Sequence, residues 1–336
     1  MPFIKDILSH RSVSIVGIEK NTGKTETLNY VLNRLKTMDT SIALTSIGVD
    51  GEQTDRVTST AKPEITIFEK MLFVTSEKHY FQRHLVSEIM DISDNRTALG
   101  RLVTAKAKIQ GKCIISGPSD TAGMKKLIEQ MKNLHVHTTL VDGALSRLSL
   151  ASPAVTDAMI LATGAAYSAN IPQLVRKTKY IQRLIELETV HTSLTKKLQK
   201  IKSGMWAIDE QNEMHDLQIP SVFLLDKRKK DIFRYGNRIY VAGAISDKLL
   251  QFLGLQNRQT ELIIHDFTKV FASQKQFDMF LKKGNSVKSI MRNNLIAVTV
   301  NPLAPNGFCL NSETLQNEMK KALQIPVYDI RKIECN

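Results

Sequence analysis

The sequence predicts an α/β protein with a parallel sheet covered by helices on both faces, followed by a second α/β unit. Strand-like and helix-like segments alternate through the first half of the chain, which is typical of parallel strands joined by right-handed crossovers. A glycine-containing loop joins the first of these strands to the first helix. A chain of 336 residues with 42% hydrophobic and 24% charged residues has room for about two globular domains, and this composition excludes disordered and collagen-like classes.

The elements of the first half follow from hydrophobic periodicity. The β-branched run 12–16 predicts the first strand, and leucines and valines recur at helical spacing over residues 28–35. The same criteria predict a further helix over 123–132. Apolar runs predict further strands over 42–45, 71–74, 102–105, 113–115, 138–142 and 159–162.

A polar, lysine-rich segment at 189–203 follows the helical stretch 171–187 and marks the expected domain boundary. We therefore expect one domain over 1–190 and a second over 200–336. The second half again mixes the two patterns. Its predicted strands are 222–225, 239–241, 262–264 and 296–300, and its predicted helices are 247–252, 274–281 and 312–323.

Nothing in the composition points to secretion or to a membrane. The first residues lack a basic region followed by a long apolar one, and no stretch approaches eighteen uncharged apolar residues. The cysteines Cys113, Cys309 and Cys335 form no C-x-x-C unit, so we expect reduced thiols. These observations predict a cytoplasmic protein.

The net charge of +13 favours anionic partners such as nucleotides, nucleic acids or acidic proteins. Basic residues cluster at 196–202 and 227–230, and more weakly at 282–283. A solvated surface explains these clusters most simply. Aromatic residues do not interleave with them, so the sequence gives little support for a nucleic-acid partner.

The strongest local signal is the segment 17–25 (GIEKNTGKT), which lies between the first predicted strand and helix. Backbone N–H groups at the positive end of a helix can surround phosphate oxygens, a lysine can reach the outer phosphates, and a threonine hydroxyl can coordinate Mg²⁺. The segment therefore predicts a nucleotide site and makes residues 1–190 the nucleotide-binding domain. Its candidate residues are Gly17, Lys20, Asn21, Thr22, Gly23, Lys24 and Thr25.

The glycine spacing of this loop is irregular. The usual phosphate loop has a glycine five positions before Gly23, where this chain has Ile18, and the glycine present is Gly17. Either the loop is one residue longer than usual or it opens differently.

Acidic residues after two predicted strands suggest a bound cation. Asp142 ends the apolar run 138–141, where P-loop proteins hold Mg²⁺, although an aspartate that caps the next turn is the alternative. Asp50, Glu52 and Asp55 follow the second strand, and we prefer Asp50 and Asp55 as metal ligands. The candidate metal residues are thus Thr25, Asp50, Asp55 and Asp142, and Lys24 and Asp142 are the candidate catalytic residues.

Three weaker features favour structural roles. His135 and His137 alternate on one strand without an acid or cysteine to complete a metal set. The turn 116–120 suits either an anion site or a helix cap, and capping is the preferred interpretation. The segment 301–308 follows a strand and can shape a site, but a structural loop is the simpler interpretation.

The phosphate loop, the Asp50 loop and residues 141–147 (VDGALSR) resemble the P-loop class that includes dethiobiotin synthetase and the molybdopterin-guanine dinucleotide accessory protein. More specifically, residues 142–147 and 151–165 resemble the ATPase subunit of the lysine 5,6-aminomutase reactivating factor. Residues 298–308 and 325–329 are similar to that family too. The resemblance implies a P-loop NTPase-like fold.

The resemblance also implies an ATPase that uses ATP and Mg²⁺. Such a protein acts as a molecular chaperone that reactivates an adenosylcobalamin-dependent lysine aminomutase, together with a MutS-like partner subunit. Two other functions stay open: a biosynthetic enzyme of the dethiobiotin synthetase type, which uses ATP to activate a small carboxylate, and a nucleic-acid-binding ATPase, which only the net charge suggests.

Overall fold

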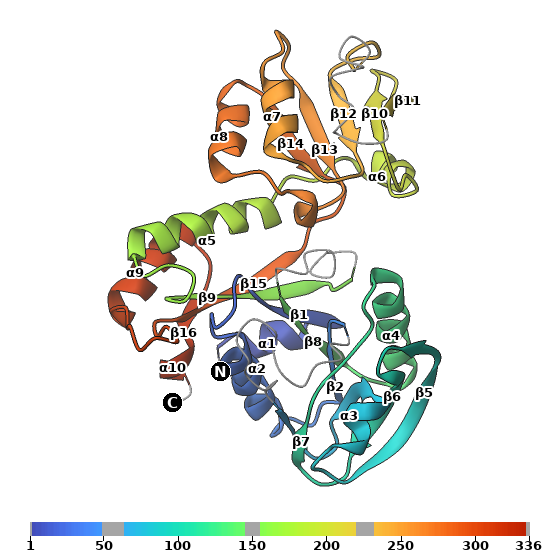
Figure 1. Cartoon of the computed structure of the whole chain (residues 1–336), viewed down its shortest axis with the longest axis vertical. Coiled ribbons are helices and arrows are strands. Elements are labelled where there is room, and N and C mark those ends of the chain that lie inside the picture. Colours follow the sequence, from blue (N-terminus) through green and yellow to red (C-terminus); the bar gives the residue numbers. More distant parts are fainter. Residues whose placement is uncertain (1, 49–63, 145–154, 220–231, 334–336) are drawn as a thin grey trace. The chain divides into compact units, whose positions relative to one another are not determined.

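The computed structural model describes residues 2–48, 64–144, 155–219 and 232–333 (Figure 1). The chain forms two compact units. The first contains Met1–Lys179 and Asn294–Asn336, and the second contains Tyr180–Asn293. The first unit is built on a large, mostly parallel sheet and the second on a smaller mixed sheet, so the predicted α/β class is confirmed at that level.

Within the described residues, the sheet of the first unit has nine strands. Neighbouring strands are parallel from β16 to β4, whereas β6 is antiparallel to both β4 and β5. In spatial order the strands are β16 (Val327–Asp329), β15 (Asn294–Asn301), β9 (Ala158–Gly164), β1 (Ser12–Gly17), β8 (Thr138–Ala144), β2 (Ile42–Ser46), β4 (Leu72–Ser76), β6 (Gly100–Ala107) and β5 (Ser87–Thr97). Two short strands, β3 (Ile65–Ile67) and β7 (Gly111–Cys113), pair separately.

Helices cover both faces of this sheet, so successive residues of its central strands are buried, as in β1 and β9. On one face, α2 (Lys24–Leu35) packs its leucines against side chains such as Ile15 and Leu140. On the other face, α4 (Thr121–Asn133) packs Met124 and Leu127 against the neighbouring strand positions, including Val141. Successive residues of a strand point to opposite faces, so each core cluster takes every second residue.

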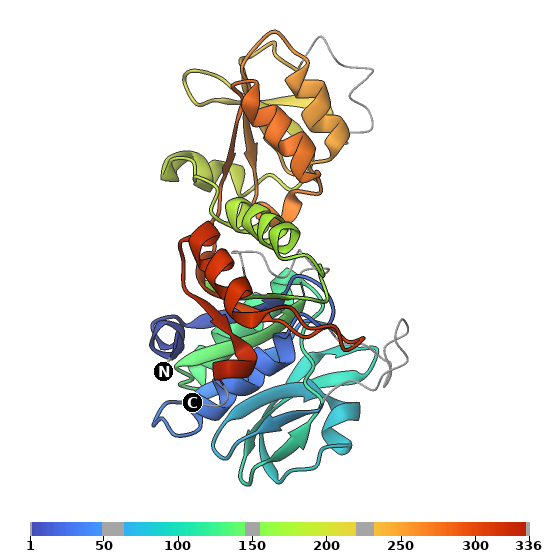
Figure 2. The ribbon, with the colours of Figure 1, turned by 90° about the vertical axis from the view of Figure 1, so that its left-hand side faces the viewer.

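The prediction of parallel strands is wrong for the segment around 102–105. This segment lies in β6, which forms an antiparallel ribbon with β5, drawn in cyan and teal in Figure 2. No strand was predicted over Ser87–Thr97. The reason is that β5 is the edge strand: register shifts interrupt its pairing at two places, and apolar residues such as Ile89 and Ile92 are exposed, so it has no regular hydrophobic period.

The last part of the chain returns to the first unit. β15, α9 (Ser312–Leu323), β16 and α10 (Ile330–Ile333) follow one another there, and α10 contacts α2. The expected domain 200–336 therefore differs from the structure, in which residues from Asn294 onward add two strands to the large sheet. Pairing between β15 and β9 joins residues more than a hundred positions apart, which local sequence patterns do not reveal.

The described part of the second unit forms a five-stranded sheet. Its strands, in spatial order, are β11 (Met214–Ile219), β10 (Met205–Ile208), β12 (Arg238–Val241), β13 (Glu261–Ile264) and β14 (Ser286–Ser289). Its helices are α6 (Thr192–Leu198), α7 (Asp247–Gly254) and α8 (Gln274–Lys282), and α7 contacts α8. The expected boundary at 189–203 contains α6, whereas the units divide near residue 180. The predicted strand 222–225 lies outside the described residues.

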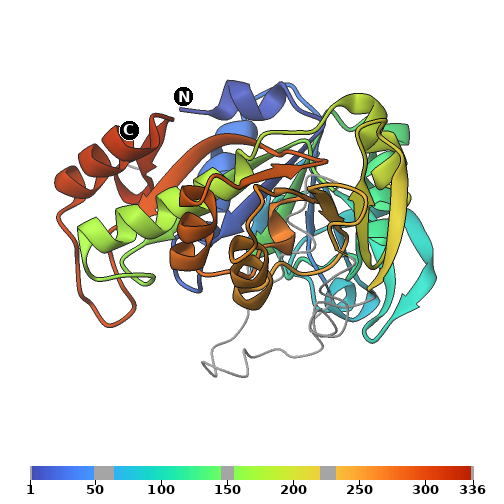
Figure 3. The same ribbon diagram turned by 90° about the horizontal axis from the view of Figure 1, so that it is seen from above.

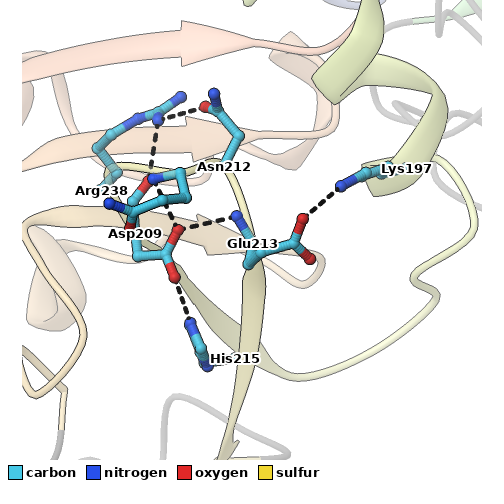
Figure 4. Close-up of polar contacts among 7 residues, drawn as sticks. Lys197, Asp209, Asn212, Glu213, His215 and Arg238 are labelled. Carbon is cyan, nitrogen blue, oxygen red and sulfur yellow. Dashed lines mark hydrogen bonds and ion pairs between the residues drawn. The ribbon is translucent and has the colours of Figure 1, made fainter.

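A polar network closes the β10–β11 hairpin, which lies at one edge of the small sheet and is yellow in Figure 3. The Asp209 carboxylate accepts hydrogen bonds from the Glu213 backbone N–H at 2.9 Å and contacts His215 Nε2 at 2.7 Å (Figure 4). Arg238 donates to Asn212 Oδ1 at 2.7 Å. The network accounts for the tight turn, because each of its side chains bonds to another part of the hairpin or to the adjacent strand.

The described residues also form α1 (Ile4–Leu8), α3 (Glu77–Phe81), α5 (Ile171–Ile185) and the 3₁₀ turn η3 (Phe267–Lys269). α5 passes from the first unit into the second. No helix within the described ranges combines the length and the apolar character needed to cross a membrane.

Candidate functional site

The phosphate-loop segment lies at the carboxyl edge of the large sheet, directly after β1. β1 lies between β8 and β9, and the chain leaves this central position in both directions: α2 leads to β2 on one side, and β15 and β16 lie on the other. In open α/β sheets, ligands bind at the carboxyl ends of the strands where the strand order reverses. The loop between β1 and α2 occupies that position.

The structure explains the irregular glycine spacing. Ile18 is 7% exposed and its backbone N–H donates to the Ala162 carbonyl at 2.9 Å, so the residue extends the pairing of β1 with β9. The turn therefore begins after Ile18, at Glu19. Ile18 occupies the position five residues before Gly23, where a glycine is usual in phosphate loops. A buried apolar side chain fits there because the Ile18 backbone is hydrogen-bonded to β9.

Gly17 allows the two ends of the loop to approach each other. A Cβ atom on Gly17 would lie 3.0 Å from Thr22 Oγ1 and 3.2 Å from the Glu19 carbonyl oxygen. Thr22 is 1% exposed, and its hydroxyl donates to the same Glu19 carbonyl at 2.8 Å. Gly17 and Thr22 thus set the loop shape from within, while Glu19, Lys20 and Asn21 are exposed.

The loop presents main-chain donors at the start of α2. Asn21 and Gly23 have φ values of 60° and 92°, and Gly23 is the N-cap residue, so no side chain caps the helix. Among the described residues, no acceptor receives the N–H groups of Asn21 to Thr25. Free N–H groups at a helix N-terminus, together with the helix dipole, form an anion-binding arrangement.

Lys24 and Asp142 meet at this site. The Lys24 ammonium lies 2.9 Å from Asp142 Oδ1, and both side chains are largely buried, at 26% and 19% exposed. Asp142 lies inside β8, paired with Ile15 of β1 and Ser46 of β2, and its carbonyl accepts the Ile47 N–H at 3.0 Å. Its carboxylate therefore faces the phosphate loop. The alternative interpretation, an aspartate that caps the next turn, does not account for its position, because β8 continues to Ala144.

Asn301, at the end of β15, borders the loop and was not among the candidate residues. A Cβ atom on Gly23 would lie 2.9 Å from the Asn301 Cβ, so the Asn301 side chain packs directly against the Gly23 backbone. Thr27 of α2 donates to the Gly23 carbonyl at 2.8 Å, and its hydroxyl lies 2.8 Å from that of Thr299. The sequence indicated that the segment 301–308 can shape a site. It did not indicate that the preceding strand, β15, pairs with β9 and so brings Asn301 beside the loop.

The described residues could supply Mg²⁺ with one or two protein ligands but not with a complete set. Within the described ranges, no three His, Cys, Asp or Glu side chains converge as a metal cage. Of the predicted metal ligands, Thr25 lies in the first turn of α2, and Asp142 contacts the Lys24 ammonium through Oδ1. Mg²⁺ commonly takes one or two protein oxygens and completes its shell with waters and phosphates. Asp50, Glu52 and Asp55 lie outside the described residues.

The weaker sequence features have structural roles in the described residues. Asp120 caps α4 by accepting the Gly123 N–H at 2.8 Å, as preferred for the turn 116–120. His135 has a φ of 57° in the turn after α4, and His137 Nδ1 lies 2.9 Å from the Thr138 hydroxyl. Residues 302–308 form a tight turn in which the Ala304 N–H donates to the Phe308 carbonyl.

Comparison with known proteins adds no family assignment: no protein-family model matches the chain, and no curated protein matches its sequence. The chemistry of the site itself therefore carries the functional argument.

Proposed function

We propose that this chain is a P-loop ATPase that binds ATP with Mg²⁺ between β1 and α2 and hydrolyses it. The observation that carries the proposal is the combination of free N–H groups over Asn21 to Thr25 with the Lys24 ammonium beside them. A polyphosphate is the ligand whose charge and oxygen geometry match both groups.

Each residue has a role in this proposal. The loop N–H groups hold phosphate oxygens. When ATP binds, the Lys24 ammonium leaves the Asp142 carboxylate and contacts the outer phosphates. Thr25 and Asp142 are the described residues that would hold Mg²⁺, with Asp50 and Asp55 as further predicted ligands. A bound cation would neutralise part of the negative charge on the phosphates. Lys24 stabilises the charge that develops on the transferred group.

Lys24→Ala tests the site. Loss of a charged hydrogen bond costs about 1.5–3 kcal/mol, so we expect ATP to bind about 10- to 150-fold more weakly. Lys36→Ala is the matched control, because Lys36 carries the same charge at the other end of α2 and is exposed. Calorimetric titration with ATP and Mg²⁺ measures both. Unchanged affinity in Lys24→Ala would remove the basis of the proposal.

Within this class, we propose that the ATPase reactivates an adenosylcobalamin-dependent aminomutase together with a MutS-like subunit. The resemblance of residues 142–147, 151–165 and 298–308 supports this use of ATP. ATP promotes release of an inactive cofactor only if the nucleotide-bound chaperone has different affinities for the open and closed mutase.

Reconstitution with a mutase and the partner subunit tests this use. We expect phosphate release to rise when both are added, and release of inactive cobalamin to require ATP. The Lys24→Ala variant is the control, since it should lose both effects. If phosphate release does not change when both proteins are added, and the chain consumes ATP with a small carboxylate, the protein is instead a synthetase of the dethiobiotin type.

A further inference from the structure

A cavity of about 690 Å³ lies in the first unit, away from the phosphate loop. Among its lining residues are Ser12 and Thr139, at the amino ends of β1 and β8. The phosphate loop follows the carboxyl end of β1. The cavity is therefore at the opposite edge of the sheet, and the nucleotide site does not account for it.

The cavity wall has an excess of positive charge. Arg11, Lys125 and Lys126 line it, and within the described residues their side chains make no hydrogen bond or ion pair. α4 contributes both lysines to this wall. Each of these side chains is exposed, so all three cations are available to a ligand.

The two acidic residues of the lining already have partners. Glu129 Oε1 contacts the Lys132 ammonium at 3.1 Å. Asp157 Oδ2 accepts hydrogen bonds from the Ser12 N–H at 3.0 Å and from the Ser12 hydroxyl at 3.1 Å. The four basic side chains Arg11, Lys125, Lys126 and Lys132 outnumber the carboxylates of Glu129 and Asp157, so the lining attracts anions.

The rest of the wall includes apolar surface. Ile128 is half-buried and packs against the core cluster that contains Val136 and Val155, which are themselves almost fully buried, at 3% and 6% exposed. The volume falls within the range of about 300–1,000 Å³ that is usual for small-molecule sites. An inorganic anion would fill little of it and would leave the apolar wall unused.

We propose that this cavity binds a small organic anion, whose phosphate, sulfonate or carboxylate group lies among Arg11, Lys125 and Lys126. The apolar part of the ligand lies against Ile128, at the edge of the core cluster that contains Val136 and Val155. This site is separate from the nucleotide site and does not depend on the proposed ATPase activity.

Three probes separate the two parts of the ligand chemistry. Anilinonaphthalenesulfonate carries both an anionic group and an apolar ring system, phenylnaphthylamine lacks the charge, and sulfate lacks the rings. In fluorescence titrations of the full chain, the sulfonate dye should bind more tightly than the neutral dye, and sulfate should displace it only weakly. The variant Lys24→Ala should bind the sulfonate dye as tightly as the parent. Equal binding of both dyes, or a loss of dye binding in Lys24→Ala, would overturn the proposal.

Substitutions locate the dye in the cavity. The triple variant Arg11→Ala, Lys125→Ala, Lys126→Ala should bind the sulfonate dye about tenfold more weakly or worse, since charge-assisted contacts are lost. The control is Lys320→Ala with Lys321→Ala, two exposed lysines at the end of α9. Ile128→Ala should weaken both dyes. Full binding by the triple variant, or an equal loss in the control, would show that the dye binds elsewhere.

Discussion

The Lys24 ammonium lies 2.9 Å from the Asp142 carboxylate, across the gap between α2 and β8. In the proposed cycle these two groups have different partners once ATP is bound: Lys24 contacts phosphate, and Asp142 contacts Mg²⁺ or its waters. The ion pair therefore competes with both ligands. It keeps two charges of the site paired while they are shielded from water, where an unpaired charge is costly.

Replacing Asp142 separates these effects. In Asp142→Asn, Lys24 loses its competing partner, so we expect ATP binding without Mg²⁺ to be as tight as in the parent or tighter. Mg²⁺-dependent hydrolysis should fall about tenfold or more, because a carboxylate near the cation is lost. Asp120→Asn is the control, since asparagine also caps a helix and Asp120 caps α4. Hydrolysis at the parent rate in Asp142→Asn would contradict the metal role.

The close approach of Gly23 to Asn301 predicts a large loss of stability in Gly23→Ala. Gly23 has a φ of 92°, which costs about 1–2 kcal/mol for an alanine, and the new Cβ would meet the Asn301 Cβ at 2.9 Å. Gly307→Ala is the matched control, because Gly307 has a φ of 85° but no atom within 4 Å of the new Cβ. Urea unfolding gives the loss of unfolding free energy in each variant. The difference between the two losses is the cost of the steric contact with Asn301. Equal losses would show that Asn301 does not crowd the loop.

The Asp209–His215 contact predicts a pH-dependent contribution to stability. Hydrogen bonds from His215 and from the Glu213 backbone hold the pKa of the Asp209 carboxyl below its usual value. A lowered folded pKa means that the contribution is present above the unfolded pKa of about 3.9 and is lost as the pH falls through the folded pKa. Asp209→Asn should therefore lower the melting temperature at pH 7 but not at about pH 2.

Asp39→Asn provides the comparison for this measurement, because Asp39 is exposed in the turn between α2 and β2. Its melting temperature should follow that of the parent at every pH. A constant difference between Asp209→Asn and the parent across the acid range would mean that the substitution acts through the turn geometry and not through the carboxylate charge.

The two cysteines in the described residues should differ in reactivity. Cys113 is buried, and burial raises the pKa of its thiol to about 12, whereas Cys309 is exposed. The thiolate is the reactive form, so Cys113 should stay unmodified at pH 8 in the folded protein. A thiol reagent applied to the variant Cys309→Ser, Cys335→Ser should react only after urea unfolding. Rapid reaction in the folded variant would contradict the burial of Cys113.

Local patterns were sufficient where each element had its own periodicity. The β-branched run before the phosphate loop became β1, and the leucine spacing after it became α2. β5 was missed because an edge strand exposed on both faces carries no regular period. Asn301 was missed as a site residue because its position beside Gly23 depends on the pairing of β15 with β9.

The amino-acid sequence alone determined the order of strand, loop and helix over 12–35 and the chemistry of the loop, because periodicity and residue type act over short distances. The tertiary structure decided which strands lie beside β1. In the tertiary structure, β15 is a strand of the large sheet, and the Asp142 carboxylate contacts the Lys24 ammonium. These arrangements depend on pairing between distant segments, which is selected by burial of the whole sheet and not by any one stretch of chain.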